Sequence, residues 1–364
     1  MKIKTITCHE VYNHGASLQE YALLHYLNYL GHSAQAIHYK PSYLSNHFKL
    51  NAVTNPVFDM PFIKQLYQLA KFPGRLRDLK RKKAFDVFGA KYIPTDSKLY
   101  TTNEELKSNI PDAEIFICGS DQIWNSFFPN GKDLAFYLNF VSDEIKKISY
   151  AASFAIDELA EDVKPLVQEN VSRLDAVGVR ETSGVRILKE LGISNAVQVL
   201  DPVFLLDKAH WENTFVKPME EKFVFVYDFD SNPLIKKIAQ TLKKENNYKI
   251  YTVNQNIDYA DKNFFLEGPE TFLSLVYHSK FNITNSFHSV AFSLIFNKQF
   301  VVVNRTEDIN TRMRDLLGLL DLKTHLIISY EDFLEINKID YKEVNKIIEV
   351  KNRFSKEFLM NNLK

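Results

Sequence analysis

The side chains with the most chemical potential lie where an apolar strand-like segment turns into a very apolar helical one. The segment reads Asn282-Ile-Thr-Asn-Ser-Phe-His-Ser289. Ser286, His288 and Ser289 cluster at the expected helix N-terminus, whose dipole and unpaired amides favour a phosphate. An imidazole there can move protons near neutral pH, although a lone histidine is more often structural. We interpret His288 as a catalytic acid or base beside a bound anion.

Three arginines are candidates for binding the same anion. Arg305 and Arg312 follow the next expected strand, and Arg180 ends an earlier strand directly before a helix. A guanidinium can bind a carboxylate or phosphate through two parallel hydrogen bonds. The structural alternatives are an ion pair between Arg180 and Glu181 or any other acidic residue nearby, and plain surface solvation, most clearly for Arg314.

A second cluster, Cys118-Gly-Ser-Asp-Gln-Ile-Trp-Asn125, ends an apolar strand in short polar side chains and an indole. Such side chains hydrogen-bond sugar hydroxyls, while Trp124 would cover an apolar sugar face and Asp121 could act as a base. The alternative is an Asx-type turn buried beneath Trp124. The candidates for the acceptor or the cleft from this cluster are Ser120, Gln122, Trp124 and Asn125.

A third cluster, Asn13-His-Gly-Ala-Ser-Leu-Gln19, follows the first strand and opens a helix. Free backbone amides there can bind an anion, and Gly15 permits close approach. One glycine is a weak signal, so an ordinary turn with Ser17 as the N-cap is equally compatible. The candidates for the acceptor or the cleft from this cluster are Asn13, Gly15 and Gln19.

These clusters need strands and helices in alternation to bring them together. Hydrophobic periodicity predicts a first series with strands over 2–8, 34–39, 114–118, 148–154, 176–179 and 197–200, and helices over 17–30, 162–173 and 182–191. It predicts a second series with strands over 223–227, 249–253, 280–284 and 299–303, and helices over 232–245, 270–278, 287–296 and 309–319. Residues 41–110 look less regular.

The alternation predicts an α/β protein of two doubly wound, Rossmann-like domains that face a cleft. We place the N-terminal domain, on the acceptor side, at 1–205 and the C-terminal domain, on the donor side, at 206–340. A final helical segment, 341–364, can pack back onto the first domain. Ligands bind at the carboxyl ends of the strands in such folds, so the cleft between the domains is the expected active site.

Composition excludes several classes. The 364 residues carry 45 Lys+Arg and 45 Asp+Glu, and this balance argues against nucleic-acid binding. Two cysteines, Cys8 and Cys118, support neither a disulfide framework nor a metal cluster, so no metal is expected. No apolar run is long enough to span a membrane, and we expect a cytoplasmic protein whose membrane contact is at most peripheral.

One strongly basic run, Gly74-Arg-Leu-Arg-Asp-Leu-Lys-Arg-Lys-Lys83, stands out from this balance. Its simplest interpretation is a solvated helix face. The alternative is that residues 75–83 contact anionic lipid head groups or a lipid diphosphate.

Taken together, these segments resemble the polysaccharide pyruvyl transferase family. The matching pieces are Asn13-x-Gly-x-x-Leu-Gln-x-x-Ala-Leu23, Gly119-Ser-Asp-Gln-x-Trp-Asn125, Ser149-Tyr-Ala-Ala-Ser153, Val179-Arg-Glu181, Leu200-Asp-Pro202, Thr284-Asn-Ser-Phe-His288 and Phe296-Asn-Lys298. Each piece is short, but their order along the chain is specific. One departure is Ser286, where many members carry a basic or tyrosyl residue.

The resemblance implies a fold similar to GT-B glycosyltransferases and a transfer from phosphoenolpyruvate to two sugar hydroxyls, forming a cyclic ketal without a cofactor. The implied acceptor is a lipid-linked oligosaccharide of a bacterial, for example capsular, polysaccharide. His288 and Asp121 would be catalytic. The implied donor-binding residues are Arg180, Arg312, Ser286, Ser289 and Arg305, and Ser153 joins the acceptor or cleft set.

Two other functions remain compatible with the sequence. A nucleotide-sugar glycosyltransferase would use the same architecture and the same kind of helix N-terminus for its diphosphate. A glycan-binding protein without catalytic activity could also keep this fold.

Overall fold

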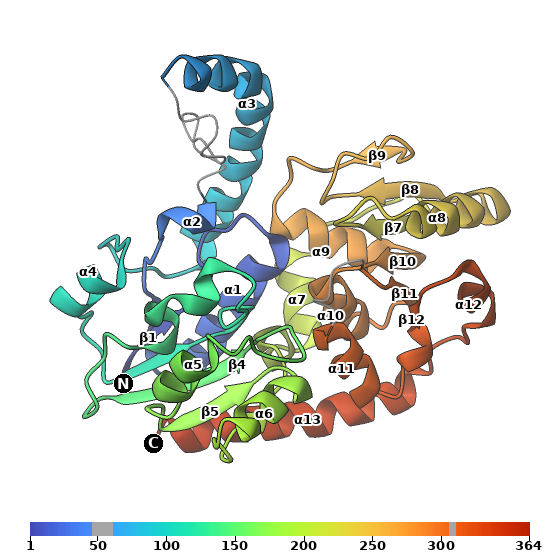
Figure 1. The fold of residues 1–364 in the computed structure, drawn as a ribbon. Helices are drawn as coiled ribbons and strands as arrows, with labels where there is room; N and C mark the ends of the chain where they lie inside the picture. The colour runs from blue at the N-terminus through green and yellow to red at the C-terminus, as the bar shows by residue number, and fades with distance from the viewer. Residues whose placement is uncertain (46–60, 306–310) are drawn as a thin grey trace.

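The molecule is formed by two six-stranded sheets, each made of parallel strands and flanked by helices (Figure 1). The computed structural model describes residues 1–45, 61–305 and 311–364. The first sheet has the order β2 (Ser33–Ala36), β1 (Lys2–Ile6), β3 (Ile115–Cys118), β4 (Lys146–Ala152), β5 (Ala176–Val179), β6 (Val197–Gln198). The second has the order β12 (Leu326–Ile327), β11 (Phe300–Val303), β10 (Phe281–Thr284), β7 (Phe223–Tyr227), β8 (Lys249–Thr252), β9 (Lys262–Asn263). The predicted α/β fold with two doubly wound sheets is confirmed.

Helices connect the strands and cover the sheets. In the first half they are α1 (His14–Tyr29), α2 (Ser42–Ser45), α3 (Pro61–Tyr92), α4 (Asn103–Ser108), α5 (Lys164–Val171) and α6 (Thr182–Glu190). In the second half they are α7 (Lys208–Phe215), α8 (Pro233–Asn246), α9 (Pro269–His278), α10 (Phe287–Ile295), α11 (Thr311–Leu319), α12 (Tyr330–Glu335) and α13 (Tyr341–Asn362). Within the described ranges, none of these helices combines the length and apolar character needed to cross a bilayer.

The strand order fixes where a ligand can bind. In each sheet the chain starts in the interior and winds outward in both directions, so the order reverses between β1 and β3 and between β7 and β10. Connections leave such a reversal point on opposite faces, which opens a crevice at the carboxyl ends of those strands. The segments that follow β1, β3, β7 and β10 are therefore the ones expected to line the site.

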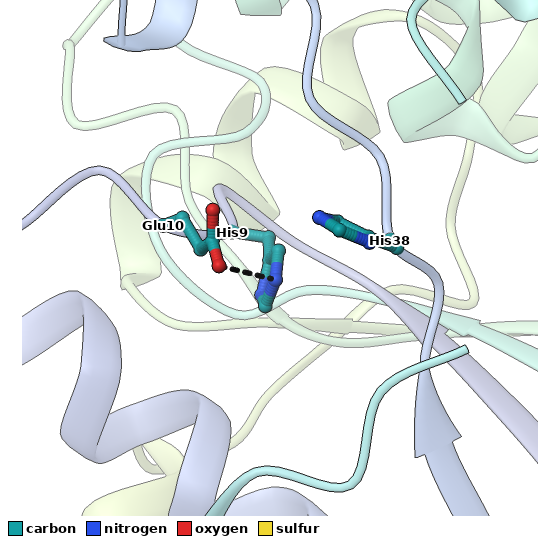
Figure 2. Close-up of side chains that lie close together, drawn as sticks. All are labelled: His9, Glu10 and His38. Atoms are coloured by element: carbon teal, nitrogen blue, oxygen red, sulfur yellow. Dashed lines mark ion pairs between the residues drawn. The ribbon is translucent and has the colours of Figure 1, made fainter. Parts of the chain in front are cut away.

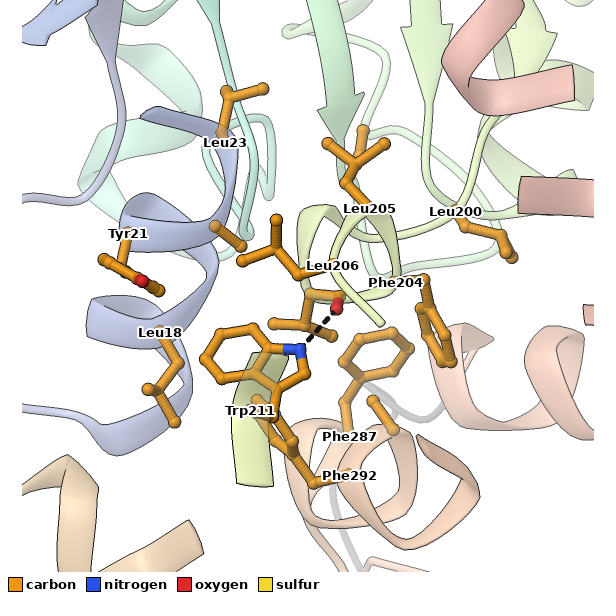
Figure 3. Close-up of a cluster of buried hydrophobic side chains, with 14 of the residues drawn as sticks. Leu18, Tyr21, Leu23, Leu200, Phe204, Leu205, Leu206, Trp211, Phe287 and Phe292 are labelled. Carbon is orange, nitrogen blue, oxygen red and sulfur yellow. Dashed lines mark hydrogen bonds between the residues drawn. The ribbon is translucent and has the colours of Figure 1, made fainter. Parts of the chain in front are cut away.

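An apolar seam joins the two sheets beneath this crevice (Figure 3). Trp211 of α7 lies at its centre, where its indole donates a hydrogen bond to the Val203 carbonyl at 3.1 Å and its ring packs edge-on against Phe292 of α10. Leu18 of α1 belongs to the same buried cluster. Helices from both halves of the chain therefore share one core, which fixes α10 relative to α1.

The C-terminal helix α13 crosses beneath both sheets (Figure 1). Its Ser355 hydroxyl accepts a hydrogen bond from the Leu200 amide at 2.9 Å. Phe358 packs near Tyr150 of β4, with 6.4 Å between ring centroids. The helix thus contacts the first sheet, while the proposed division at 205 and 340 stays a prediction.

Two sequence-based expectations were wrong in detail. Helix α1 begins at His14 rather than residue 17, because the Asn13 side chain accepts hydrogen bonds from the amides of Gly15 and Ala16 and caps the helix four residues earlier than Ser17 would. The region 41–110 is not irregular throughout, since α3 is a 32-residue helix that projects from the body (Figure 1). Two residues of the expected helix 309–319 lie outside the described residues.

The basic run lies on α3, but it is not a uniformly solvated face. Arg75 and Arg81 are buried. The Arg81 guanidinium donates hydrogen bonds to the carbonyls of Val253 and Phe265 and lies 4.8 Å from the Phe265 ring centroid. It therefore fastens α3 to the second sheet, and the exposed cations of the run are Arg77, Lys80 and Lys83.

Candidate active site

A pocket of about 340 Å³ opens at the carboxyl ends of both sheets. Its lining comes from the segments after β1, β3, β7 and β10, as the strand order requires, and also from Arg305 after β11 and from α11. The lining residues are Asn13, Asp121, Gln122, Phe128, Phe229, Asn285, Ser286, Phe287, His288, Arg305, Arg312 and Met313.

His288 stands in the first turn of α10 and is 6% exposed. Its Nε2 lies 3.6 Å from Oδ2 of Asp201, which is fully buried. The other side of the ring faces Gly15 so closely that a Cβ built on Gly15 would lie 2.0 Å from Nδ1. A carboxylate and a glycine therefore hold the imidazole from two sides.

Asp201 is the centre of the polar network, and no role for it was predicted from the sequence. Arg180 Nη1 donates to Asp201 Oδ2 at 2.6 Å, and Ser120 Oγ lies 3.4 Å from the same oxygen. Burial alone would raise the pKa of Asp201, but His288 and Arg180 hold it well below its usual range. In the sequence, only the Leu200-Asp-Pro202 motif pointed to a role for Asp201. The nearness of Asp201 to Arg180 and His288 depends on the fold and could not be predicted.

Arg180 and Arg312 flank a second carboxylate, Asp121. The distances from Asp121 Oδ1 are 3.5 Å to Arg180 Nη2 and 3.7 Å to Arg312 Nη1. Burial opposes ionisation, yet Arg180, His288 and Arg312 lower the pKa of Asp121. A carboxylate with a lowered pKa is a weak base near neutral pH, so this geometry favours an electrostatic role for Asp121 over proton abstraction.

Arg312 is the cation best placed for an incoming anion. Its guanidinium is buried, lies 5.6 Å from the Phe287 ring centroid, and has an Nε with no hydrogen-bond partner. Burial and the neighbouring Arg180 lower the pKa of Arg312 to about 10. Because a buried cation next to another cation is costly, a bound anion would relieve both penalties.

The N-terminus of α10 adds backbone donors to the same pocket. Ser286 is the N-cap residue, but its side chain makes no capping hydrogen bond. Ser286 lines the pocket, whereas Ser289 is fully buried with an unpaired hydroxyl. Arg305, which stacks on Phe229 at 5.0 Å from the ring centroid, completes this side.

The Glu181 carboxylate, one of the alternative partners expected for Arg180, bonds elsewhere, whereas the other alternative, a nearby acidic residue, is Asp201. Its Oε1 accepts hydrogen bonds from the Ser153 hydroxyl and from the amides of Phe154 and Ala155. Burial raises the pKa of Glu181. Ser153 therefore holds this carboxylate rather than facing the pocket.

Trp124 does not cover a sugar. It is fully buried, stacks on Tyr137 with 5.5 Å between ring centroids, and donates to the Phe136 carbonyl at 3.0 Å. This correction follows from the fold, because the indole turns into the core of the first domain. The alternative of a polar turn buried beneath Trp124 describes the structure better.

Some of the remaining polar candidates make structural hydrogen bonds, and others line the pocket. Gln19 links α1 to the turn after β3, because its Oε1 accepts from the Ser120 amide at 3.2 Å and its Nε2 donates to Thr7 Oγ1. Asn125 is buried and donates to Gln122 Oε1 at 2.7 Å. Gln122 and Asn13 line the pocket, although Asn13 also caps α1 and occupies the amides once considered for an anion.

Comparison with known proteins identifies the family. The profile of the polysaccharide pyruvyl transferases matches residues 13–307. The chain belongs to the polysaccharide pyruvyl transferase family. No protein of curated function matches the chain in sequence.

Solved structures resemble this chain in fold. The UDP co-structure of Staphylococcus aureus MnaA is 11% identical with a TM-score of 0.52, and the alignment covers 100% of this chain and 96% of that one. The UDP-GlcNAc 2-epimerase of Neisseria meningitidis, bound to UDP-GlcNAc, is 10% identical with a TM-score of 0.48 over 99% and 100% of the chains. UGT89C1 of Arabidopsis thaliana, complexed with UDP-L-rhamnose, is 12% identical with a TM-score of 0.48 over 100% and 97%. At this identity, the likeness to MnaA is one of fold alone.

Proposed function

We propose that this pyruvyl transferase moves the enolpyruvyl unit of phosphoenolpyruvate onto two hydroxyls of one sugar in a bacterial polysaccharide precursor. The product is a cyclic pyruvate ketal, and phosphate is released. One observation carries the proposal: an imidazole, two guanidinium groups and an uncapped helix N-terminus converge on one pocket.

Phosphoenolpyruvate has two anionic groups, a phosphate and a carboxylate. The pocket offers a separate set of hydrogen-bond donors for each. We assign the phosphate to the amides at the start of α10 together with Arg305. We assign the carboxylate to Arg312, whose guanidinium lacks a full set of partners. We do not assign Arg180 to a direct contact with phosphoenolpyruvate, because its guanidinium pairs with Asp201 and lies close to Asp121.

We propose that His288 is the general acid and base of the reaction. Protonation of C3 of the enol makes C2 cation-like, and the oxygen of one sugar hydroxyl attacks C2 as it loses its proton. The C2–O bond to phosphate then breaks, and the second hydroxyl attacks C2 and closes the ring, its proton leaving with phosphate. These steps balance without an oxidant or reductant, so the proposed reaction needs no redox cofactor.

The acceptor is proposed to approach along a second hollow. A pocket of about 520 Å³ lies beside Arg314, with Asn304 and Thr311, which neighbour Arg305 and Arg312, in its lining. Phe127 and Ile328 on its rim are 62% and 78% exposed. Aromatic and aliphatic side chains next to polar ones suit the mixed faces of a sugar.

A lipid-linked acceptor would explain the exposed cations of α3. We propose that Arg77, Lys80 and Lys83 contact anionic lipid at the inner face of the membrane. Replacing all three by Gln should weaken binding to phosphatidylglycerol vesicles, while neutral phosphatidylcholine vesicles report the background. Arg75 and Arg81 stay unchanged because they are buried, and undiminished binding to the anionic vesicles would contradict this part of the proposal.

Calorimetric titration with phosphoenolpyruvate tests the donor site. Arg312→Gln removes a charged hydrogen-bond donor and should weaken binding by about 1.5–3 kcal/mol, or roughly 10- to 150-fold. The exposed Arg353→Gln on α13 is the matched control and should bind normally. Equal affinities of the two variants would remove Arg312 from the donor site.

His288→Gln tests the chemistry separately from binding. Transfer of label from ¹⁴C-phosphoenolpyruvate into a glycolipid extract should fall about 10²- to 10⁴-fold, because general acid–base catalysis is lost. Phosphoenolpyruvate affinity and the unfolding midpoint should change little. Undiminished transfer would show that another group moves the protons.

A further inference from the structure

A cluster of two histidines and a glutamate lies outside the pocket and has no part in the proposed reaction (Figure 2). His9 and Glu10 follow β1, and His38 follows β2. These two strands pair in parallel, so their carboxyl ends bring the three side chains to one edge of the first sheet. The arrangement depends on pairing between segments about 30 residues apart in sequence.

The potential ligand atoms are already close together. One nitrogen of each imidazole and one oxygen of Glu10 all lie within 4.8 Å of one another. His9 Nε2 is 3.8 Å from Glu10 Oε1, and the rings of His9 and His38 meet edge-on with 5.4 Å between centroids. Ligands at about 2.0 Å around a tetrahedral ion stand roughly 3.3 Å apart, so small side-chain movements would complete the geometry.

A second carboxylate orients the first histidine. His9 Nδ1 lies 2.8 Å from Glu20 Oε1, and both side chains are almost fully buried at 5% and 3% exposure. A carboxylate that accepts the Nδ1 proton leaves Nε2 free to bind a metal, and this carboxylate–histidine pairing is the usual outer shell of such sites. Glu20 is fixed for this purpose on α1.

Lys40 is the one cation that contacts the cluster in the described part of the chain. Its ammonium pairs with Glu10 Oε2 and lies 3.0 Å from the Tyr12 hydroxyl. Glu10 Oε1 faces His9 instead, so the two carboxylate oxygens have different partners. The two carboxylates of Glu10 and Glu20 and the one ammonium of Lys40 leave a net charge of −1 at the cluster. This charge suits the cluster to binding a cation.

We propose that His9, Glu10 and His38 bind one divalent transition-metal ion of the Zn²⁺ class, with Glu20 as the residue that positions His9. Two imidazoles and one carboxylate suit Zn²⁺ better than Mg²⁺ or Ca²⁺, which prefer oxygen ligands alone. Three protein ligands leave a fourth position open for water or a ligand oxygen. The inference is independent of the proposed pyruvyl transfer.

The consequence for the fold concerns the segment between β1 and α1. Glu10 and Tyr12 both have positive φ angles there, at 51° and 55°, which non-glycine residues adopt only when their surroundings hold them. This segment leads directly to Asn13 and Gly15. A metal bound at Glu10 would stabilise it and raise the unfolding temperature.

Titration of the chelator-treated, full-length protein with Co²⁺ and Zn²⁺ tests the site. We expect one equivalent of Co²⁺ to give visible d–d absorption, Zn²⁺ to displace it, and ZnCl₂ to raise the unfolding midpoint. Glu20→Gln should weaken binding about 10- to 100-fold. His38→Gln should weaken it more, because it removes a ligand, and Glu10→Gln serves as a second ligand variant if His38→Gln does not fold.

The control is His32→Gln, which changes a histidine outside the cluster and should bind Co²⁺ as the unchanged protein does. Circular dichroism without metal checks that each variant folds. Absence of saturable one-equivalent binding would leave only a metal-free network of ion pairs and would overturn the proposal. Equal affinity of His38→Gln and Glu10→Gln with the unchanged protein would overturn it as well.

Discussion

Gly15 and His288 form the contact on which the site depends most at the scale of single residues. A Cβ at residue 15 would lie 2.0 Å from Nδ1 and 2.2 Å from Cγ of His288, so one of the two residues must shift. Displacement of a catalytic group by about 1 Å can cost about 10²-fold in rate. We expect Gly15→Ala to lower kcat by roughly that factor, measured as ketal formation at saturating phosphoenolpyruvate.

The same substitution should leave the fold intact, because alanine is a better helix former than glycine. Gly89→Ala in α3 is the matched control, since nothing lies within 4 Å of its added Cβ. That control should keep full activity and gain about 0.4–1 kcal/mol of stability. A Gly15→Ala enzyme with undiminished kcat would show that the position of His288 does not matter for turnover.

At the scale of secondary-structure elements, α13 supports the turn that carries Asp201. The buried Ser355 hydroxyl accepts the Leu200 amide proton at 2.9 Å and donates to the Lys351 carbonyl at 2.8 Å. Ser355→Ala leaves the Leu200 amide without this partner, which should cost about 1–3 kcal/mol. Urea denaturation followed by circular dichroism measures the loss.

Glu357→Ala on the exposed face of α13 is the control for Ser355→Ala and should change the free energy of unfolding by less than about 0.5 kcal/mol. If the two variants were equally stable, the contact between α13 and Leu200 would contribute nothing. Because Leu200 precedes Asp201, we also expect Ser355→Ala to lower kcat more than Glu357→Ala does.

The elements could be predicted from the sequence because their signals are local. The run Phe223–Tyr227 is wholly apolar, as a strand covered on both faces must be, and β7 has those same bounds. The start of α1 was misplaced because Asn13 and Ser17 are both good N-caps, and only the fold decides between them. Apart from the basic run, which was interpreted as a helix face, α3 was missed because its basic and proline-containing sequence gives a weak periodic signal.

Site residues could be predicted from the sequence only where they directly follow the end of an apolar strand. His288, Arg312 and Asp121 follow strand ends, and the structure brings all three to one pocket. Trp124 carried the same local signal but faces the core, and Asp201 carried almost none although it contacts Arg180 and His288. The direction of a side chain depends on tertiary packing, which spacing along the chain does not contain.

At the scale of the whole molecule, an ion pair bridges the two halves beside the cleft. Both carboxylate oxygens of Asp157 accept hydrogen bonds from Arg314 at 2.8 Å, and Arg186 donates to Oδ1 at 3.0 Å. The hydrogen bond from Arg314 is the main cause that lowers the pKa of Asp157 to about 2. Both side chains are 46% exposed, so solvent screening limits the pair to about 0.2–1 kcal/mol.

The sign of the pH dependence follows from the lowered pKa. The carboxylate of Asp157 is ionised in both states above about pH 4, its unfolded pKa, so its stabilising contribution is fully present there. The contribution is lost as the pH falls from about 4 towards 2. Urea unfolding should therefore show a stability advantage over Asp157→Asn at pH 6.5 that shrinks at pH 3.0, and an advantage that grew on acidification would contradict this assignment.

The central claim is that the pocket between the sheets binds phosphoenolpyruvate as the donor of a pyruvyl group. Thermal unfolding of the purified protein with phosphoenolpyruvate, UDP-galactose, GDP-mannose or inorganic phosphate, all at one ionic strength, tests it most directly. A ligand at about 100 times its Kd stabilises the folded state by about 2.7 kcal/mol, which shifts the unfolding midpoint by a few degrees. We predict a selective shift with phosphoenolpyruvate that is lost in Arg312→Gln. A shift with a nucleotide sugar and none with phosphoenolpyruvate would contradict the account and assign the pocket to glycosyl transfer.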